Sequence, residues 1–158
     1  MGQGDGNMLF NFEMDFATSL RCVPMIVRMK LDICGIKLSL RQWSRFTRED
    51  RHALVARSID TRMERVAYRA FLLHLIRIRA GDMAEFLPPA RAEAWQLPDG
   101  VPDAIRLKAE TDGLRPPTPE QWRHLSSLQR FALVKLTRRG HENQNFGPAL
   151  REFLDGNG

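Results

Sequence analysis

Apolar side chains recur along most of the chain at the three- and four-residue spacing of amphipathic helices. Together with the residues that start and stop helices, this spacing predicts helices over residues 24–34, 40–46, 48–57, 60–80, 102–112, 119–138 and 148–154. The fold class that we predict is all-α: a compact single-domain helical bundle of about six to seven helices with an extended N-terminal arm.

Polar residues and glycines mark most of the predicted helix ends. A Ser or Thr followed three residues later by Gln, Glu or Asp is the capping-box pattern, in which two side chains satisfy free backbone N–H groups. That pattern occurs at Ser39, Thr47, Thr61 and Thr118. Glycine fits the left-handed position after a helix, and the glycines in that position are Gly35, Gly81, Gly113 and Gly140.

Two long helices are predicted to form the centre of the core, as a hairpin-like pair over 60–80 and 119–138. The apolar face of the first is predicted to comprise Met63, Val66, Ala67, Ala70, Phe71 and Leu73. Leu72, Leu75 and Ile76 widen this face, so much of the second half of the helix is predicted to be buried. The second carries Trp122, Leu125, Leu128, Ala132, Leu133 and Leu136. We predict no internal repeat and no low-complexity tract.

The first forty residues leave two questions open. Residues 1–7 are Gly-rich and are predicted to form a flexible tail. The period-two alternation of apolar residues over 8–16 predicts a strand or an extended arm, and we favour the arm because a lone strand needs a partner. Residues 26–40 also alternate, so a hairpin around Cys34 and Gly35 competes with the helix over 24–34. We favour the helix because the rest of the chain is strongly helical.

Prolines are concentrated in one stretch of the chain. Seven of the nine prolines fall in residues 88–119, which predicts a Pro-rich connector on the surface. Trp95 and Leu97 lie within it and are expected to anchor it to the core. We therefore predict one helical domain over 8–158 that includes this connector.

The net charge of +5 is unevenly distributed. Residues 21–79 hold 14 basic and five acidic residues, whereas residues 1–20 carry −3 and residues 80–158 carry −1. A basic segment of this kind can bind an acidic protein partner or nucleic acid, or it can be the solvated face of helices. The basic residues that we predict to form a partner surface are Arg41, Arg45, Arg48, Arg62, Arg65 and Arg69.

Several classes of protein are not expected from this composition. The longest apolar runs are far shorter than the roughly 18 residues of a membrane span, and the N-terminus lacks the features of a signal peptide. We therefore expect no membrane contact and a cytoplasmic location. Cys22 and Cys34 and the four scattered histidines lack the spacing of a zinc site, so we predict no metal and no cofactor. Whether the two cysteines are reactive is left open.

One polar cluster could support chemistry. His141 stands beside Glu142 and Asn143, and such a group offers a general base, an orienting carboxylate and an amide donor. The alternative is structural, because Gly140 ends a helix and Asn143 is a turn former. The sequence contains no nucleophile motif and no glycine-rich phosphate loop, so we lean against an enzyme.

Two longer segments resemble a known family. These are Leu20–Leu38 followed by Trp43, and Gln129–Arg138 followed by Gly140–Asn143 and Asn145–Phe146. They resemble the nitrate reductase-associated protein family of cyanobacteria and other bacteria, over about Phe10 to Phe153. Members of that family are encoded near nitrate-assimilation and molybdopterin-cofactor genes. The resemblance implies an accessory role in nitrate assimilation, and it transfers no catalytic residue.

Three functions are carried forward from these observations. The first is an accessory protein that binds nitrate reductase, or a protein of its molybdopterin cofactor pathway, through the basic surface. The second is a small-anion or cofactor-precursor binding protein, with or without enzymatic activity, whose site lies between the 20–38 and 129–146 segments. Its predicted ligand-binding residues are Lys30, Lys37, Lys135, Arg138, His141, Glu142 and Asn143. The third is DNA binding, which we expect least.

Overall fold

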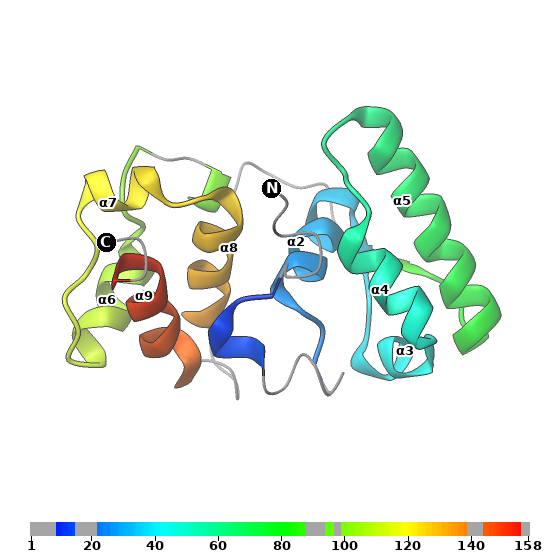
Figure 1. Ribbon diagram of the computed structural model, residues 1–158, viewed down its shortest axis with the longest axis horizontal. Coiled ribbons are helices and arrows are strands. Elements are labelled where there is room, and N and C mark those ends of the chain that lie inside the picture. The colour runs from blue at the N-terminus through cyan, green and yellow to red at the C-terminus, as the bar shows by residue number, and fades with distance from the viewer. Residues whose placement is uncertain (1–8, 15–21, 88–93, 97–98, 139–143, 156–158) are drawn as a thin grey trace. The chain divides into compact units, whose positions relative to one another are not determined.

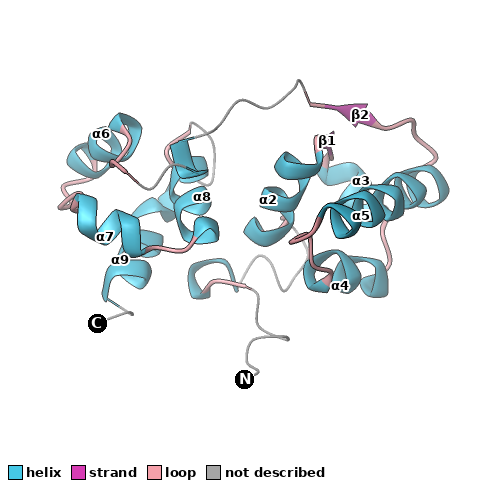
Figure 2. Cartoon of the chain, turned by 90° about the horizontal axis from the view of Figure 1, so that it is seen from above, coloured by secondary structure: helices cyan, strands magenta, loops and turns pink. Residues whose placement is uncertain are grey.

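The computed structural model describes residues 9–14, 22–87, 94–96, 99–138 and 144–155, and it confirms the all-α fold class (Figures 1 and 2). The chain divides into two compact units, Met1–Ala90 and Arg91–Gly158. The single domain over 8–158 stays a prediction, and the predicted tail at 1–7 lies outside the described residues.

The first unit is built from helices α2 (Met25–Cys34), α3 (Leu40–Arg45), α4 (Arg48–Ala56) and α5 (Arg62–Leu75). Helix α5 continues as one turn of π-helix, η2 (Ile76–Ala80). Two short strands, β1 (Ile36–Lys37) and β2 (Glu85–Phe86), pair antiparallel with Ile36 opposite Phe86. The core is formed by fully buried side chains of these elements, among them Val27, Trp43, Leu54, Tyr68, Leu72 and Ile76.

Helix α2 decides between the two alternatives for residues 26–40. The segment is helical, and it ends at Gly35, whose φ of 75° is left-handed. Glycine adopts that conformation without the steric cost that a Cβ brings. The hairpin alternative is wrong, because β1 pairs with residues 85–86 and not with residues inside α2.

The prediction of an extended arm over residues 8–16 is wrong for residues 11–13. Residues Asn11–Glu13 form a turn of 3₁₀-helix, η1, whereas residues 8 and 15–16 lie outside the described residues. The buried carboxylate of Glu13 accepts hydrogen bonds from the backbone N–H groups of Phe10 and Met25, each at 3.1 Å. Met25 is the first residue of α2, so Glu13 satisfies a free N–H at the start of that helix. This tertiary demand outweighs the local alternation.

The apolar face predicted for residues 60–80 is buried only in part. Met63 is 83% exposed and Val66 62% exposed, and Ala67 and Ala70 are exposed as well. Leu72, Leu75 and Ile76 are buried as predicted, and Tyr68, which was not part of the predicted face, is buried with them. They also recur at helical spacing and carry more apolar area than a stripe that contains two alanines. In addition, the Tyr68 hydroxyl finds a buried acceptor in the backbone oxygen of Leu54, at 2.7 Å.

The second unit consists of η3 (Ala94–Gln96), α6 (Asp103–Thr111), α7 (Pro119–His124), α8 (Ser127–Leu136) and α9 (Phe146–Asp155). Helix α8 packs against η3, α6 and α9. Trp95, which the sequence predicted to be an anchor, is buried with its ring edge-on to Phe131 at 5.3 Å between centroids. Leu97 lies outside the described residues.

The single helix predicted over 119–138 is wrong. It breaks at Leu125, whose φ of −68° and ψ of 149° are extended. The cause is a further capping box: the Ser126 hydroxyl accepts from the N–H of Gln129, and the Gln129 side chain accepts from the N–H of Ser126. Helices α7 and α8 belong to one unit and α5 to the other. The predicted pairing of 60–80 with 119–138 therefore stays a prediction.

The two units contain the same helical module, so the prediction of no repeat is wrong. Residues 39–55 read SLRQWSRFTREDRHALV, and residues 118–134 read TPEQWRHLSSLQRFALV, with six identical residues at a constant offset of 79. The repeat begins earlier. A Val-Pro pair precedes both α2 and α6, and a left-handed glycine follows each of these helices, Gly35 and Gly113.

The repeat holds in three dimensions as well. Both six-residue helices, α3 and α7, start at a capping box, bury a tryptophan completely and end at an extended residue, Phe46 or Leu125. A second capping box then opens α4 or α8. Each unit is thus a copy of one helix–turn–helix arrangement with its own third helix, α5 or α9, packed against it.

Candidate functional site

The first candidate site is an exposed stripe on α5, which we call the α5 face: Met63, Val66, Ala67 and Ala70. Val66 and Ala67 lie three and four residues after Met63, and Ala70 lies four and three residues after them, so all four side chains lie on one side of the helix. Surface apolar residues are ordinary when scattered, but a stripe along one helix is typical of a surface that binds another protein. The α5 face is the part of the predicted core that the structure leaves uncovered.

Basic side chains border the α5 face. Arg62 and Arg69 lie four residues before and three residues after Val66, so the three share one edge of the helix. The guanidinium of Arg69 lies 5.0 Å from the centre of the exposed Phe86 ring, which adds an aromatic group beside this edge. Arg77, in η2 two residues beyond the end of α5, is also exposed. The stripe is therefore apolar along its middle and positive along one side.

Of the other predicted partner-surface residues, two bind groups within the protein and two are exposed. Arg65 is half-buried and donates to the backbone oxygens of Ile59 and Asp60, each at 3.1 Å, so it holds the loop before α5. Arg41 pairs with Asp82 at 2.7 Å. Arg45 on α3 and Arg48 on α4 are exposed. DNA binding by this helix–turn–helix stays a prediction.

Lys30, a predicted ligand-binding residue, is buried and engaged. Its ammonium group donates to the backbone oxygen of Val55, at 2.8 Å, and to that of Arg57. These oxygens lie at the C-terminal end of α4, where carbonyls lack helical partners. Desolvation lowers the pKa of Lys30, although Asp60 acts in the opposite direction. The geometry favours a structural role, in which Lys30 ties α2 to the end of α4.

The remaining predicted ligand residues are distributed over both units. Lys37 is exposed on β1, opposite Glu85 on β2. In the second unit the Lys135 ammonium lies 5.2 Å from the centre of the Phe131 ring, and Arg138 is exposed after α8. His141, Glu142 and Asn143 lie outside the described residues. A common site for these residues therefore stays a prediction.

Cys22 and Cys34 do not form a disulfide. Cys34 is buried, and its sulfur lies 3.9 Å from the Arg65 backbone oxygen. Burial raises the pKa of the Cys34 thiol, against the opposing effect of nearby Arg69, Arg65 and Lys30. A raised pKa lowers the thiolate fraction, so Cys34 is a poor nucleophile. Among the described residues, no group of three or more His, Cys, Asp or Glu side chains could hold a metal ion.

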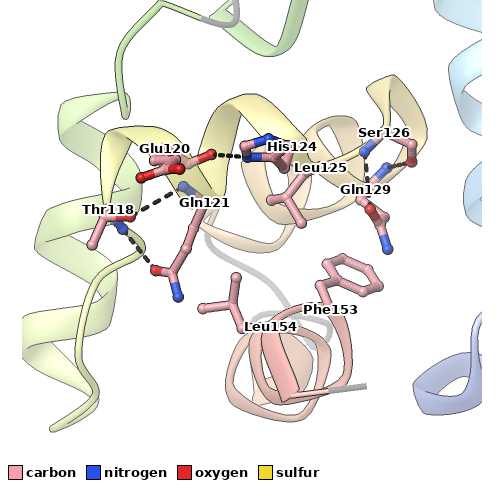
Figure 3. Close-up of a pocket in the computed structure, with 9 residues that line it drawn as sticks. All are labelled: Thr118, Glu120, Gln121, His124, Leu125, Ser126, Gln129, Phe153 and Leu154. Carbon is pink, nitrogen blue, oxygen red and sulfur yellow. Dashed lines mark hydrogen bonds between the residues drawn. The ribbon is translucent and has the colours of Figure 1, made fainter. Parts of the chain in front are cut away.

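The second candidate site is a pocket of about 540 Å³ in the second unit, which we call the α7–α9 pocket (Figure 3). It lies between the α7–α8 turn and the C-terminal end of α9. Its lining residues are Thr118, Glu120, Gln121, His124, Leu125, Ser126, Gln129, Phe153 and Leu154. The pocket was missed from the sequence. A second Ser-x-x-Gln pattern, at Ser126, was the signal that could have indicated its α7–α8 turn.

Two capping-box glutamines give the α7–α9 pocket its polar character. The Oε1 atoms of Gln121 and Gln129 accept from the backbone N–H groups of Thr118 and Ser126, each at 2.9 Å. This fixes both amide groups so that their Nε2 atoms point toward Phe153 and Leu154 (Figure 3). An adjoining pocket of about 290 Å³ shares Gln121 and Leu154 and adds Arg115 and Arg151.

Comparisons with known proteins point to one family. Comparison with curated proteins gives no match, and comparison with solved structures gives none either. No helix among the described residues is both long enough and apolar enough to span a membrane. A family profile described as conserved nitrate reductase-associated protein matches residues 9–153. Because this match covers most of the chain, the protein belongs to the conserved nitrate reductase-associated protein family.

Proposed function

We propose that this protein is a non-enzymatic, cytoplasmic accessory protein of nitrate assimilation. It binds nitrate reductase, or a protein of the molybdopterin cofactor pathway that serves nitrate reductase, through the α5 face and its bordering arginines. The family links the chain to nitrate reductase, and the α5 face is the observation that carries the proposal.

The chemistry of the α5 face specifies its partner. Apolar side chains at the centre and arginines at the edge are the composition of many protein interfaces. The spacing of Met63, Val66 and Ala70 alternates between three and four residues, as on a helix that packs along another helix. Arg62, Arg69 and Arg77 favour a partner whose helix carries Asp or Glu beside its apolar stripe. The expected partner element is therefore an acidic amphipathic helix.

A binding measurement with purified proteins tests the proposal. The double variant Met63→Glu/Val66→Glu places two carboxylates on the α5 face, where they oppose both burial and an acidic partner. We expect it to weaken binding to nitrate reductase, or to the molybdopterin-pathway protein, by about tenfold or more. The matched control is Leu107→Glu on α6, because Leu107 is equally apolar and also exposed.

Circular dichroism and thermal melting establish that the variants are folded. Loss of binding in the double variant with retention in Leu107→Glu supports the proposal. Equal affinities for wild type and the double variant contradict it. So does the absence of binding to every nitrate-assimilation protein that is tested.

A further inference from the structure

The internal repeat allows the α7–α9 pocket to be compared with the equivalent surface in the first unit. At the constant offset of 79 residues, Gln121 corresponds to Gln42 and Gln129 corresponds to Asp50. The capping residues correspond too, Thr118 to Ser39 and Ser126 to Thr47. The pocket wall formed by α7 and α8 therefore has a counterpart formed by α3 and α4.

In the first unit this surface is covered by the chain itself. The segment 79–82, which follows α5, lies on it: Arg79 Nε donates to Asp50 Oδ2 at 2.9 Å, and Gln42 Nε2 donates to Asp82 Oδ2 at 3.2 Å. Arg41 pairs with the same Asp82 oxygen at 2.7 Å. As a result Gln42 is 6% exposed and Asp50 8% exposed. The free amide nitrogen of the capping-box glutamine is thus satisfied by a polypeptide acceptor.

In the second unit the same wall is open. Gln121 is exposed and Gln129 half-buried, and no described residue accepts a hydrogen bond from either Nε2 atom. Helix α9 has ten residues, Phe146–Asp155. By contrast, α5 and η2 together run from Arg62 to Ala80. The equivalent cover is not supplied by the described residues of the second unit.

Two substitutions between the repeats specify what the open wall accepts. Glu120 stands where the first unit has Arg41, and the neutral Gln129 stands where it has Asp50. A carboxylate in the position of Asp82 would face Glu120, and like charges repel. The wall therefore favours uncharged carbonyl acceptors at the two amide nitrogens and a cation beside Glu120. The adjoining pocket is lined by Arg115, Arg151 and Asp155, so its two cations outnumber its one carboxylate and favour an acidic group at the opposite end.

We propose that the α7–α9 pocket is a docking site for a polypeptide segment of a partner protein, which covers it as residues 79–82 cover the first unit. The segment presents backbone or side-chain carbonyl groups to Gln121 and Gln129 and a Lys or Arg to Glu120. This site lies in the second unit and is independent of the α5 face. It adds a second contact for a protein ligand. At its Glu120 end it favours a cationic group, whereas the α5 face favours an acidic one.

Two peptides serve as probes for this site. The first peptide has the sequence of residues 76–83, IRIRAGDM. The second has the same sequence with Asp82→Lys. Each is titrated into the ¹⁵N-labelled full chain, and the side-chain amide signals of Gln121 and Gln129 report contact with the pocket. We expect saturable shifts of these signals with the Asp82→Lys peptide, and affinity about threefold lower for the unchanged peptide, the size of one exposed ion pair.

A charge swap on the protein provides the decisive control. Glu120→Arg is expected to reverse the preference, so that the unchanged peptide binds better than the Asp82→Lys peptide. Glu110→Arg, an exposed site on α6, is the matched control and is expected to leave the preference unchanged. The proposal is overturned if neither peptide shifts the two glutamine signals. It is equally overturned if Glu120→Arg and Glu110→Arg change the preference to the same degree.

Discussion

Arg51 donates a hydrogen bond from Nε to the backbone oxygen of Trp43, eight residues earlier, at 3.1 Å. Arg130, its counterpart in the second unit, makes the same connection from Nη1 to the oxygen of Trp122, at 3.5 Å. Each guanidinium also bonds the next carbonyl, that of Ser44 or Arg123. Helices of six residues are marginal by themselves, so these arginines and the buried tryptophans hold α3 and α7 in place.

Removal of either arginine is expected to destabilise its unit. Arg51→Met removes the side-chain donors to the oxygens of Trp43 and Ser44, and Arg130→Met removes those to Trp122 and Arg123. The Trp43 and Trp122 oxygens keep the backbone N–H groups of Phe46 and Leu125, so the cost is that of the lost charge-assisted hydrogen bonds, roughly 1–3 kcal/mol. The larger loss is expected for Arg130, because it is buried and also donates to the oxygens of Trp95 and Leu125. Urea unfolding measures the effect. The control is Arg123→Met on the exposed side of α7, and equal losses for all three variants would contradict the assignment.

Lys30 is expected to stabilise the fold and not to bind a ligand. Lys30→Met keeps a long apolar stem but removes the donor to the oxygens of Val55 and Arg57, so we expect about 1–3 kcal/mol of lost stability. Lys37→Met, at an exposed position on β1, is expected to change little. Thermal melting in phosphate separates this role from the predicted anion site. If phosphate raises the melting temperature of wild type but not of Lys30→Met, Lys30 binds the anion and the structural assignment is wrong.

The hydrogen bonds of Asp50 are expected to make the stability of the folded protein depend on pH. Although desolvation acts in the opposite direction, hydrogen bonds from Thr47 and Arg79 hold the pKa of the Asp50 carboxyl below its ordinary value. A carboxylate whose pKa is lower in the folded state stabilises the fold above the ordinary carboxyl pKa, and this contribution is lost as the pH falls through the folded-state pKa. Asp50→Asn retains the capping oxygen and loses the ion pair with Arg79.

The expected result for Asp50→Asn is a loss of about 0.5–1 kcal/mol at pH 7 that shrinks toward pH 3, since the pair is partly exposed. Unfolding in urea at several pH values measures both. Glu110→Gln, on the exposed side of α6, is the control. Its difference in unfolding free energy from wild type should not shrink as the pH falls. A difference between wild type and Asp50→Asn that stays constant with pH would show that the Arg79 pair contributes nothing.

Local chemistry explains which parts of the fold could be predicted. The boxes at Ser39, Thr47, Thr61 and Thr118 are confirmed, and so are the left-handed glycines Gly35, Gly81 and Gly113. In each case the groups that decide the geometry are within a few residues of one another. The break at Leu125 was missed because a continuous apolar pattern runs across it, although Ser126 and Gln129 carry the same local signal.

Features that depend on distant residues could not be predicted in this way. Helix α5 has two apolar stripes, and only the packing of α2 and α4 decides that Tyr68 and Leu72 are buried while Met63 and Val66 are not. The role of Lys30 depends on the end of α4, which is 25 residues away in sequence. The α7–α9 pocket exists because α9 covers less of its wall than α5 and η2 cover in the first unit, a difference that appears only when the two units are compared.

Truncation of a side chain is expected to destabilise the protein on the buried face of α5 and to change its stability little on the exposed face. Leu72→Ala removes a fully buried side chain and leaves a cavity, which costs about 2–5 kcal/mol. Met63→Ala removes a side chain that is mostly in water, so its effect on stability is expected to be within about 0.5 kcal/mol. Urea unfolding of the two variants distinguishes the observed packing from the face that the sequence pattern predicted. If Met63→Ala costs as much as Leu72→Ala, the α5 face is covered within the protein itself and is not free to bind a partner.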